Sequence, residues 1–251
     1  VDRNNRLIAY DKTLYKLWAH PKYFNFPGDN SKTKRSIEEV VSKLSPLLDI
    51  DEKKLLGKFI NKNIGVELFD DLTEEQAHKI RNLYISGLDL ERHSKRFYPQ
   101  SNLFSNIVGF VNDDKNGSSG LELHLDNQIK ILQKSNFLRK GADGTPLPDI
   151  SGPNDFISDD KKMVLTLDSR LQKVSYNVLS KQVKKWGAKK GMAIVMNVQN
   201  GEILSLTSFP SFDPNKFWEY DQSVFKGWYS QDLFEPGSTF KPINLALALE
   251  E

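Results

Sequence analysis

The 251-residue sequence contains no cysteine, so disulfide bonds and thiolate metal sites are excluded. Its four histidines, His20, His78, His93 and His124, lack the spacing of metal ligands, and we expect neither a metal site nor a cofactor. No apolar run reaches the length of a membrane span, and no signal peptide is recognisable. A net charge of only +2 gives no support for nucleic-acid binding.

The composition that is present, 38% hydrophobic and 27% charged, is typical of a soluble globular protein with one large or two ordinary domains. One stretch is densely basic, from Lys181 to Lys190, and we interpret it as the solvent-facing side of a helix. The chain begins at Val1 rather than at methionine and stops within a predicted helix at Glu251, so we expect it to be a piece of a longer protein.

The first part of the chain is predicted to be a mixed module. Residues 7–10 and 14–19 are aliphatic and aromatic and are predicted to form short strands. Helical apolar spacing follows in residues 37–44 and 55–60. A capping box at residues 73–76 predicts a further helix that ends near Gly87.

The polar and charged residues between Asp149 and Lys162 predict a domain boundary, which gives domains of residues 1–155 and 156–251. Beyond it, residues 163–167 are predicted to form a strand, and residues 192–198 and 202–207 a hairpin through Asn200-Gly201. Between them we expect a helix that starts at Asp168 or Ser169 and ends at Gly187. The apolar face of that helix is predicted to contain Leu171, Val174, Val178, Leu179, Val183 and Trp186. The fold class is therefore α+β with an antiparallel sheet.

The segment from Glu235 to Pro242 has the pattern of an activated serine nucleophile. Ser238 and Lys241 are three positions apart, so they lie on one side of a helix, where the amine can take the hydroxyl proton. Pro236-Gly237 predicts a sharp entry, which places Ser238 among the unpaired N–H groups of a helix start. Such a donor can hold an oxyanion. We predict Ser238 as the nucleophile and Lys241 as the general base.

Spacing alone does not identify this site. Ser-x-x-Lys also occurs at Ser31/Lys34, Ser158/Lys161 and Ser223/Lys226. Only Ser238/Lys241 combines a Pro-Gly entry with an apolar helix behind it, and we interpret the other pairs as solvated side chains.

Several motifs, in order, resemble class B penicillin-binding proteins, the peptidoglycan transpeptidases, and most closely their division-specific (FtsI-like) branch. In the first part they are Asp2-Arg3-Asn4 with Arg6-Leu7-Ile8-Ala9, Arg96-Phe97-Tyr98-Pro99, Gly109-Phe110-Val111 and Gly120-Leu121-Glu122. In the second part they are Leu165-Thr166-Leu167-Asp168, Asn200-Gly201-Glu202, Phe209 to Asn215 and Phe234 to Pro242. Asn5 stands where the family has glycine, and asparagine also tolerates a left-handed backbone.

The resemblance implies a non-catalytic pedestal (dimerisation-type) domain, followed by the first part of a penicillin-binding/transpeptidase (serine β-lactamase-like) domain. It implies a structural role for Arg96, Tyr98, Pro99 and Glu122, with an ion pair between Arg96 and Glu122 that locks the pedestal. Ser238 would attack the carbonyl between the two terminal D-alanines of a peptidoglycan stem peptide. An amino group from a neighbouring strand would then capture the acyl-enzyme, and β-lactams would acylate the same serine.

The same resemblance implies a role in septal cell-wall synthesis, cell division and cell shape. It also implies a plasma-membrane location on the outer (periplasmic) face, through one upstream helix. Expected partners are divisome membrane proteins such as a FtsW-like glycosyltransferase, with no nucleic acid.

The family's later motifs are missing, because Ser-x-Asn occurs only at Ser175-Tyr176-Asn177 and no Lys-Ser/Thr-Gly triplet exists. We therefore expect these 251 residues alone to be inactive, although their parent is an enzyme. Three alternatives stay open: an elongation-specific transpeptidase, a non-catalytic divisome scaffold, and a β-lactam sensor or β-lactamase-like protein.

Overall fold

The computed structural model describes residues 1–24, 36–60, 65–133, 162–233 and 235–250. The chain divides into two compact units. One combines the first nine residues, Val1–Ala9, with Tyr98–Glu251, and the other is the intervening segment Tyr10–Phe97. The predicted boundary after residue 155 lies outside the described residues, as do Ser31/Lys34 and Ser158/Lys161.

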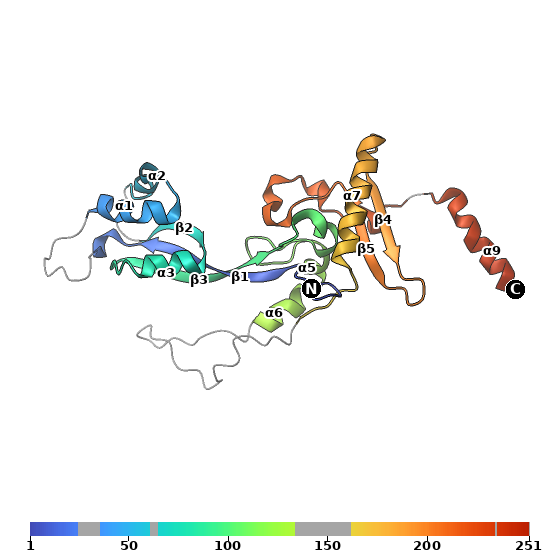
Figure 1. The fold of residues 1–251 in the computed structure, drawn as a ribbon, viewed down its shortest axis with the longest axis horizontal. Helices are drawn as coiled ribbons and strands as arrows, with labels where there is room; N and C mark the ends of the chain where they lie inside the picture. The colour runs from blue at the N-terminus through green and yellow to red at the C-terminus, as the bar shows by residue number, and fades with distance from the viewer. Residues whose placement is uncertain (25–35, 61–64, 134–161, 234, 251) are drawn as a thin grey trace, which may run out of the picture. The chain divides into compact units, whose positions relative to one another are not determined.

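The unit Tyr10–Phe97 is a three-stranded antiparallel sheet, ordered β2-β1-β3, with helices α1, α2 and α3 (Figure 1). Its elements are β1 (Tyr10–Ala19), α1 (Ile37–Leu48), α2 (Glu52–Lys58), β2 (Val66–Leu72), α3 (Glu74–Arg81) and β3 (Leu88–Phe97), with a short 3₁₀ turn at Pro21–Tyr23. The strand predicted for residues 14–19 is confirmed as part of β1, whereas the separate strand predicted for residues 7–10 is wrong, because β1 begins only at Tyr10 and runs without a break to Ala19. Residues 7–9 belong instead to the other unit.

Alternation along β1 places Tyr15, Leu17 and Ala19 in one buried cluster with the apolar stripe of α1. The predicted helices α1 and α2 are confirmed. The capping box of α3 is confirmed in both directions: Thr73 Oγ1 accepts from Gln76 N at 3.3 Å, and Gln76 Oε1 accepts from Thr73 N at 3.0 Å. The helix ends at Arg81, however, well before the predicted stop at Gly87.

The unit that contains both chain termini is built mostly of short elements. They are 3₁₀ turns at Ser101–Leu103, Pro214–Glu219, Gln222–Val224 and Gly237–Phe240, helices α4 (Ser105–Val108), α5 (Gly120–His124), α6 (Asp126–Gln133), α7 (Ser169–Lys185), α8 (Trp228–Gln231) and α9 (Lys241–Glu250), and strands β4 (Gly191–Met196) and β5 (Ile203–Phe209). Helix α7 packs along the antiparallel pair β4-β5 (Figure 1). Phe110 packs in one aromatic core with Phe212, Phe217 and Phe225. This core joins the segment before α7 to the segment after β5.

Helix α7 begins and ends, and the β4-β5 hairpin turns, at the residues whose types predict these features. Asp168 caps the helix by accepting from Arg170 N and Leu171 N, and Gly187 ends it with a left-handed φ of 61°. In the hairpin, Gly201 has φ 75° and Asn200 Oδ1 accepts from Glu202 N at 3.1 Å. The predicted cap, stop and turn are therefore confirmed.

The predicted apolar face of α7 is wrong in part. Val174, Val178 and Trp186 are 59%, 55% and 75% exposed, whereas Gln172 is fully buried. The carboxamide of Gln172 donates to the carbonyls of Leu103 and Leu206, and accepts from Leu206 N. A polar residue occupies the buried face because it satisfies main-chain groups that an aliphatic side chain would leave unpaired.

Residues 163–167 do not form the predicted strand. They run beside the N-terminal residues instead: Leu165 N donates to Val1 O, and Arg3 N to Leu167 O, both at 3.0 Å. The N-terminal turn is closed by Asp2 N donating to Arg6 O at 2.9 Å, with Asn5 at φ 59°. Asparagine thus adopts the left-handed conformation expected at this position.

Candidate active site

Ser238 lies on the 3₁₀ turn Gly237–Phe240, and Lys241 is the first residue of α9. Gly237 has a φ of 56°, which gives the chain its sharp entry into the turn. Pro242 falls in the first turn of α9, where its missing N–H leaves no hydrogen bond unmade. The prediction that helical structure starts beside Ser238 is confirmed.

Both side chains are exposed, and among the described residues neither makes a hydrogen bond or an ion pair. The contact between the hydroxyl and the amine therefore stays a prediction. Helix α9 buries none of its described residues, and Ile243, Leu245 and Leu249 are 51%, 63% and 78% exposed. Within the described residues, Lys241 does not have the burial that a lysine base requires.

The segment before Ser238 is held by an ion-pair node at Asp232. Lys226 and Lys190 both contact its carboxylate, Lys190 at 3.3 Å. The hydrogen bond from Lys226, followed by that from Lys190, lowers the pKa of Asp232. Tyr229 adds a second attachment, since its hydroxyl donates to Asn106 O at 2.8 Å, and burial raises the pKa of Tyr229. Lys226 of the Ser223/Lys226 pair is therefore bound to Asp232.

Two of the four predicted structural residues form a buried contact. Tyr98 and Glu122 are 4% and 3% exposed, and the Tyr98 hydroxyl donates to Glu122 Oε1 at 3.4 Å while accepting from Val111 N at 3.0 Å. Arg96 pairs across the strands with Asp11 at 3.4 Å. The predicted ion pair between Arg96 and Glu122 stays a prediction, as does the structural role of Pro99.

Two glycines of the predicted motifs are required by close backbone approach. A Cβ on Gly109 (φ 79°) would lie 1.9 Å from Ser119 O, and one on Gly120 (φ 57°) would lie 2.5 Å from Ile107 O. Each segment thus packs its backbone against the other, with no room for a side chain.

Asp2 anchors the N-terminal turn to the first residue of α7, a role that sequence patterns alone do not reveal. It is completely buried and accepts from Ser169 Oγ at 2.6 Å, Ser169 N at 3.1 Å, and the N–H groups of Asn4 and Arg6 at 2.8 Å. Burial alone would raise the pKa of Asp2, but these hydrogen bonds, that from the Ser169 hydroxyl first, outweigh it and lower the pKa to about 2. Asp2 thereby fixes the N-terminal segment to the start of α7.

One group of side chains has the composition of a metal site. Carboxylate oxygens of Asp70 and Asp71 and a ring nitrogen of His93 lie within 4.8 Å of one another. Both carboxylates are already occupied by cations, because Lys16 lies 3.3 Å from Asp70 and Lys95 lies 2.5 Å from Asp71. We therefore assign no metal to this group.

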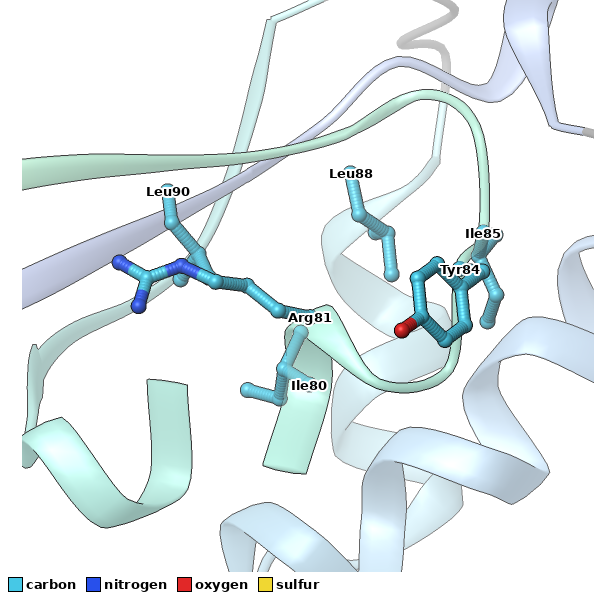
Figure 2. A pocket seen from close by; sticks show the side chains of 6 residues that line it. All are labelled: Ile80, Arg81, Tyr84, Ile85, Leu88 and Leu90. Carbon is cyan, nitrogen blue, oxygen red and sulfur yellow. The ribbon is translucent and has the colours of Figure 1, made fainter. Parts of the chain in front are cut away.

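The unit Tyr10–Phe97 also has a surface pocket of about 270 Å³. Figure 2 shows its lining by Ile80, Arg81, Tyr84, Ile85, Leu88 and Leu90. Four of these side chains are aliphatic, and the Arg81 guanidinium is engaged with the Tyr15 ring at 4.9 Å. This lining contains neither predicted catalytic residue. Separately, none of the helices in the described parts of the chain has the length and hydropathy for a membrane span.

Comparison with known proteins covers both ends of the chain. Residues 1–147 match the penicillin-binding protein dimerisation domain, and residues 191–251 match the penicillin-binding protein transpeptidase domain. The α+β prediction of the first domain followed by the start of the second is thereby confirmed.

Among curated relatives, a "Peptidoglycan D,D-transpeptidase FtsI homolog" of Chlorokybus atmophyticus is 36% identical over 99% of this chain and 35% of that protein. A protein of the same description from Mesostigma viride is 34% identical over 99% of this chain and 40% of that protein. This chain therefore spans well under half the length of these relatives.

A solved complex between a penicillin-binding protein (PBP2) and MreC from Helicobacter pylori is similar in fold, with a TM-score of 0.57 and 19% identity. The similarity covers 96% of this chain and 48% of the solved chain. Together with the match of a family domain to more than half of the sequence, these findings show that the chain belongs to the penicillin-binding proteins.

Proposed function

We propose that this chain is the pedestal and nucleophile-bearing part of a peptidoglycan D,D-transpeptidase. The observation that carries the proposal is the segment Glu235–Pro242, which puts a serine on a helical turn and a lysine three residues later, inside the range that matches the transpeptidase domain. Names of the relatives support the same activity.

In this proposal Ser238 Oγ attacks the carbonyl carbon between the two terminal D-alanines of a stem peptide, and its proton passes to the Lys241 amine. The C–N bond of the tetrahedral intermediate then breaks as the Lys241 ammonium returns the proton to the leaving amine, so D-alanine departs and an acyl-enzyme ester remains on Ser238. An amino group of a neighbouring stem peptide then displaces Ser238 and forms the cross-link. A β-lactam undergoes the same first step: Ser238 Oγ attacks the lactam carbonyl, and the ring C–N bond breaks as the ester forms.

The reaction needs residues that this chain does not contain. Lys241 must be shielded from solvent, so that its pKa falls, before it can act as a base. The described residues leave both Lys241 and Ser238 exposed. The relatives are much longer than the matched region. We infer that the 251 residues alone are inactive and that the function belongs to a longer protein, with a non-catalytic part over residues 1–155 and a catalytic part that starts at 156.

Covalent labelling tests the proposed chemistry. The longer protein is treated with a fluorescent penicillin and the adduct is located by mass spectrometry. We expect one adduct, on Ser238, that is absent from Ser238→Ala and retained by the matched control Ser223→Ala. An adduct on any other residue would contradict the assignment. A stoichiometric adduct on the 251-residue chain would contradict its inactivity.

The biological setting is a separate part of the proposal. We infer a septal role because the relatives are named FtsI homologs, and attachment to the outer face of the plasma membrane through an upstream helix. The solved neighbour is in complex with a protein, MreC, which supports a protein partner for this chain as well. We propose that its partners are divisome membrane proteins such as a FtsW-like glycosyltransferase. If Ser238→Ala in the longer protein still supports septation, the chain is a scaffold. Rapid turnover of β-lactams would instead indicate a β-lactamase-like enzyme.

A further inference from the structure

The charge of this chain is not evenly distributed. It has 35 basic and 33 acidic residues, yet residues 169–201 contain seven basic residues and no acidic residue. The seven are Arg170, Lys173, Lys181, Lys184, Lys185, Lys189 and Lys190. Five of them, with Trp186, gather where α7 ends, and we call Lys181, Lys184, Lys185, Trp186, Lys189 and Lys190 the basic end of α7.

Every member of the basic end of α7 is exposed. Gln172 and Val183 lie on the buried side of the helix, whereas Val174 and Val178 are exposed one turn apart on the opposite side. At helical spacing that exposed stripe continues at Lys181 and Lys185. Figure 1 shows α7 beside β4 and β5, with which its buried side is in contact.

Within the described parts of the chain, almost none of this charge is neutralised. Lys190 makes an ion pair with Asp232 at 3.3 Å. Among the described residues, the ammonium groups of Lys184 and Lys185 contact only aromatic rings, those of Phe209 and Trp186 respectively. Lys181 and Lys185 are like charges at i,i+4, an arrangement that destabilises an isolated helix. The helix dipole accounts for cations in the last turn, such as Lys184 and Lys185, but it does not account for Lys181, Lys189 or Lys190.

Trp186 gives the basic end of α7 an apolar component. Its indole is 75% exposed, and its Nε1 donates to Gln182 Oε1 at 3.2 Å. The ammonium of Lys185 lies 5.5 Å from the ring centroid. Trp with clustered lysines is the residue combination that favours a membrane–water interface, where the ring enters the headgroup layer and the ammonium groups meet lipid phosphates.

We propose that the basic end of α7 docks on a membrane surface that contains anionic phospholipid. Six of the seven cations are lysines. A lysine ammonium is a compact point charge that suits a diffuse layer of lipid phosphates, whereas arginine is selected where one phosphate or carboxylate is bound by two parallel hydrogen bonds. The exposed Val174 and Val178 extend the apolar component along the same helix. This inference is independent of the acyl transfer proposed for Ser238.

The test is sedimentation of the 251-residue chain with vesicles of phosphatidylcholine, with and without phosphatidylglycerol. We expect binding only to the anionic vesicles, lost at high salt. Lys181→Gln/Lys185→Gln should weaken it about 30-fold, since each lysine contributes roughly fivefold. Lys181→Arg/Lys185→Arg should preserve binding. The matched control Lys53→Gln/Lys54→Gln, which removes two exposed lysines from α2, should also preserve it.

Tryptophan emission provides a second readout. We expect a blue shift on binding that Trp186→Phe abolishes, while Trp18, Trp218 and Trp228 remain as internal references. Binding to neither vesicle would overturn the proposal, and so would equal losses for the α2 control pair. Binding to peptidoglycan sacculi but not to vesicles would overturn the lipid assignment, as would lysine-dependent self-association without vesicle binding. Circular dichroism of each variant separates these outcomes from misfolding, and labelling of Ser238 in the longer protein tests the proposed function separately.

Discussion

The Asn215 carboxamide binds both main-chain polar groups of Tyr98: its Oδ1 accepts from Tyr98 N and its Nδ2 donates to Tyr98 O, each at 2.9 Å. The side chain thus imitates the edge of a β-strand. Its orientation is fixed by Asp213 Oδ1, which accepts from Asn215 N and Nδ2 at 2.9 Å. Two motifs far apart in sequence are joined by one carboxamide.

Asn215→Ala should therefore lower the free energy of unfolding by roughly 1–3 kcal/mol, because it removes the acceptor of the partly buried Tyr98 N–H and one of the two donors to the Tyr98 C=O, the other being Ser101 N. Urea denaturation of both proteins measures the difference. Asn177→Ala is the matched control, since Asn177 is exposed on α7, and it should change stability by less than about 0.5 kcal/mol. Equal effects of the two substitutions would show that the carboxamide contributes nothing specific.

Asp2 predicts an acid-dependent loss of stability. Its pKa is lowered from 3.8 to about 2, so its contribution is fully present above pH 3.8 and is lost as the pH falls toward 2. The lost contribution is roughly 2 kcal/mol for a shift of this size. Unfolding free energies of the wild type and Asp2→Asn, measured from pH 7 to 2, should converge at the acid end. A constant difference across that range would contradict the prediction.

Gly109→Ala should prevent correct packing of the segment around α4 and α5. The new Cβ would meet Ser119 O at 1.9 Å, a backbone atom that cannot yield as a flexible side chain does, and the φ of 79° adds strain. We expect a loss above roughly 3 kcal/mol, or insoluble protein. Gly57→Ala on α2 is the control, because nothing lies within 4 Å of its Cβ. Helix propensity predicts that this control is neutral or stabilising by about 0.5–1 kcal/mol.

Lys241→Ala in the longer protein should slow acylation of Ser238 by penicillin by roughly 10²- to 10⁴-fold, the usual contribution of a positioned base. Stopped-time labelling followed by gel fluorescence measures the rate constant. Lys53→Ala, which removes an exposed lysine from α2, should leave acylation within about threefold of the wild type. An unchanged rate in Lys241→Ala would remove Lys241 from the proposed mechanism.

Where the determinants are local, the sequence predicts this structure well. The side chains of Thr73 and Gln76 each accept a hydrogen bond from the other's backbone N–H. The hairpin turn at Asn200-Gly201 depends only on the conformation of these two residues, and Asn5 adopts a left-handed conformation by itself. The Pro236-Gly237 entry also forms as its residue types dictate.

Long-range pairing explains what the sequence did not reveal. Residues 163–167 have strand composition, but they meet Val1 and Arg3 rather than a strand. Val174 and Val178 have helical apolar spacing, yet the helix buries Gln172 because main-chain groups of Leu103 and Leu206 need partners there. The distant partners that Asp2 and Asn215 bind, Ser169 and the Tyr98 main chain, lie more than 100 positions away in the chain, so no short window of sequence contains both members of either contact.

The segment Tyr10–Phe97 leaves and re-enters the rest of the chain through neighbouring positions, since Tyr10 and Phe97 are cross-strand partners in β1 and β3. Its two ends are therefore already closed upon each other, and the segment has the topology of a cassette. A short glycine bridge from Ala9 to Tyr98 would span the same gap without disturbing the order of any remaining element. The whole segment can therefore be exchanged, in evolution or by design, at one pair of adjacent chain positions.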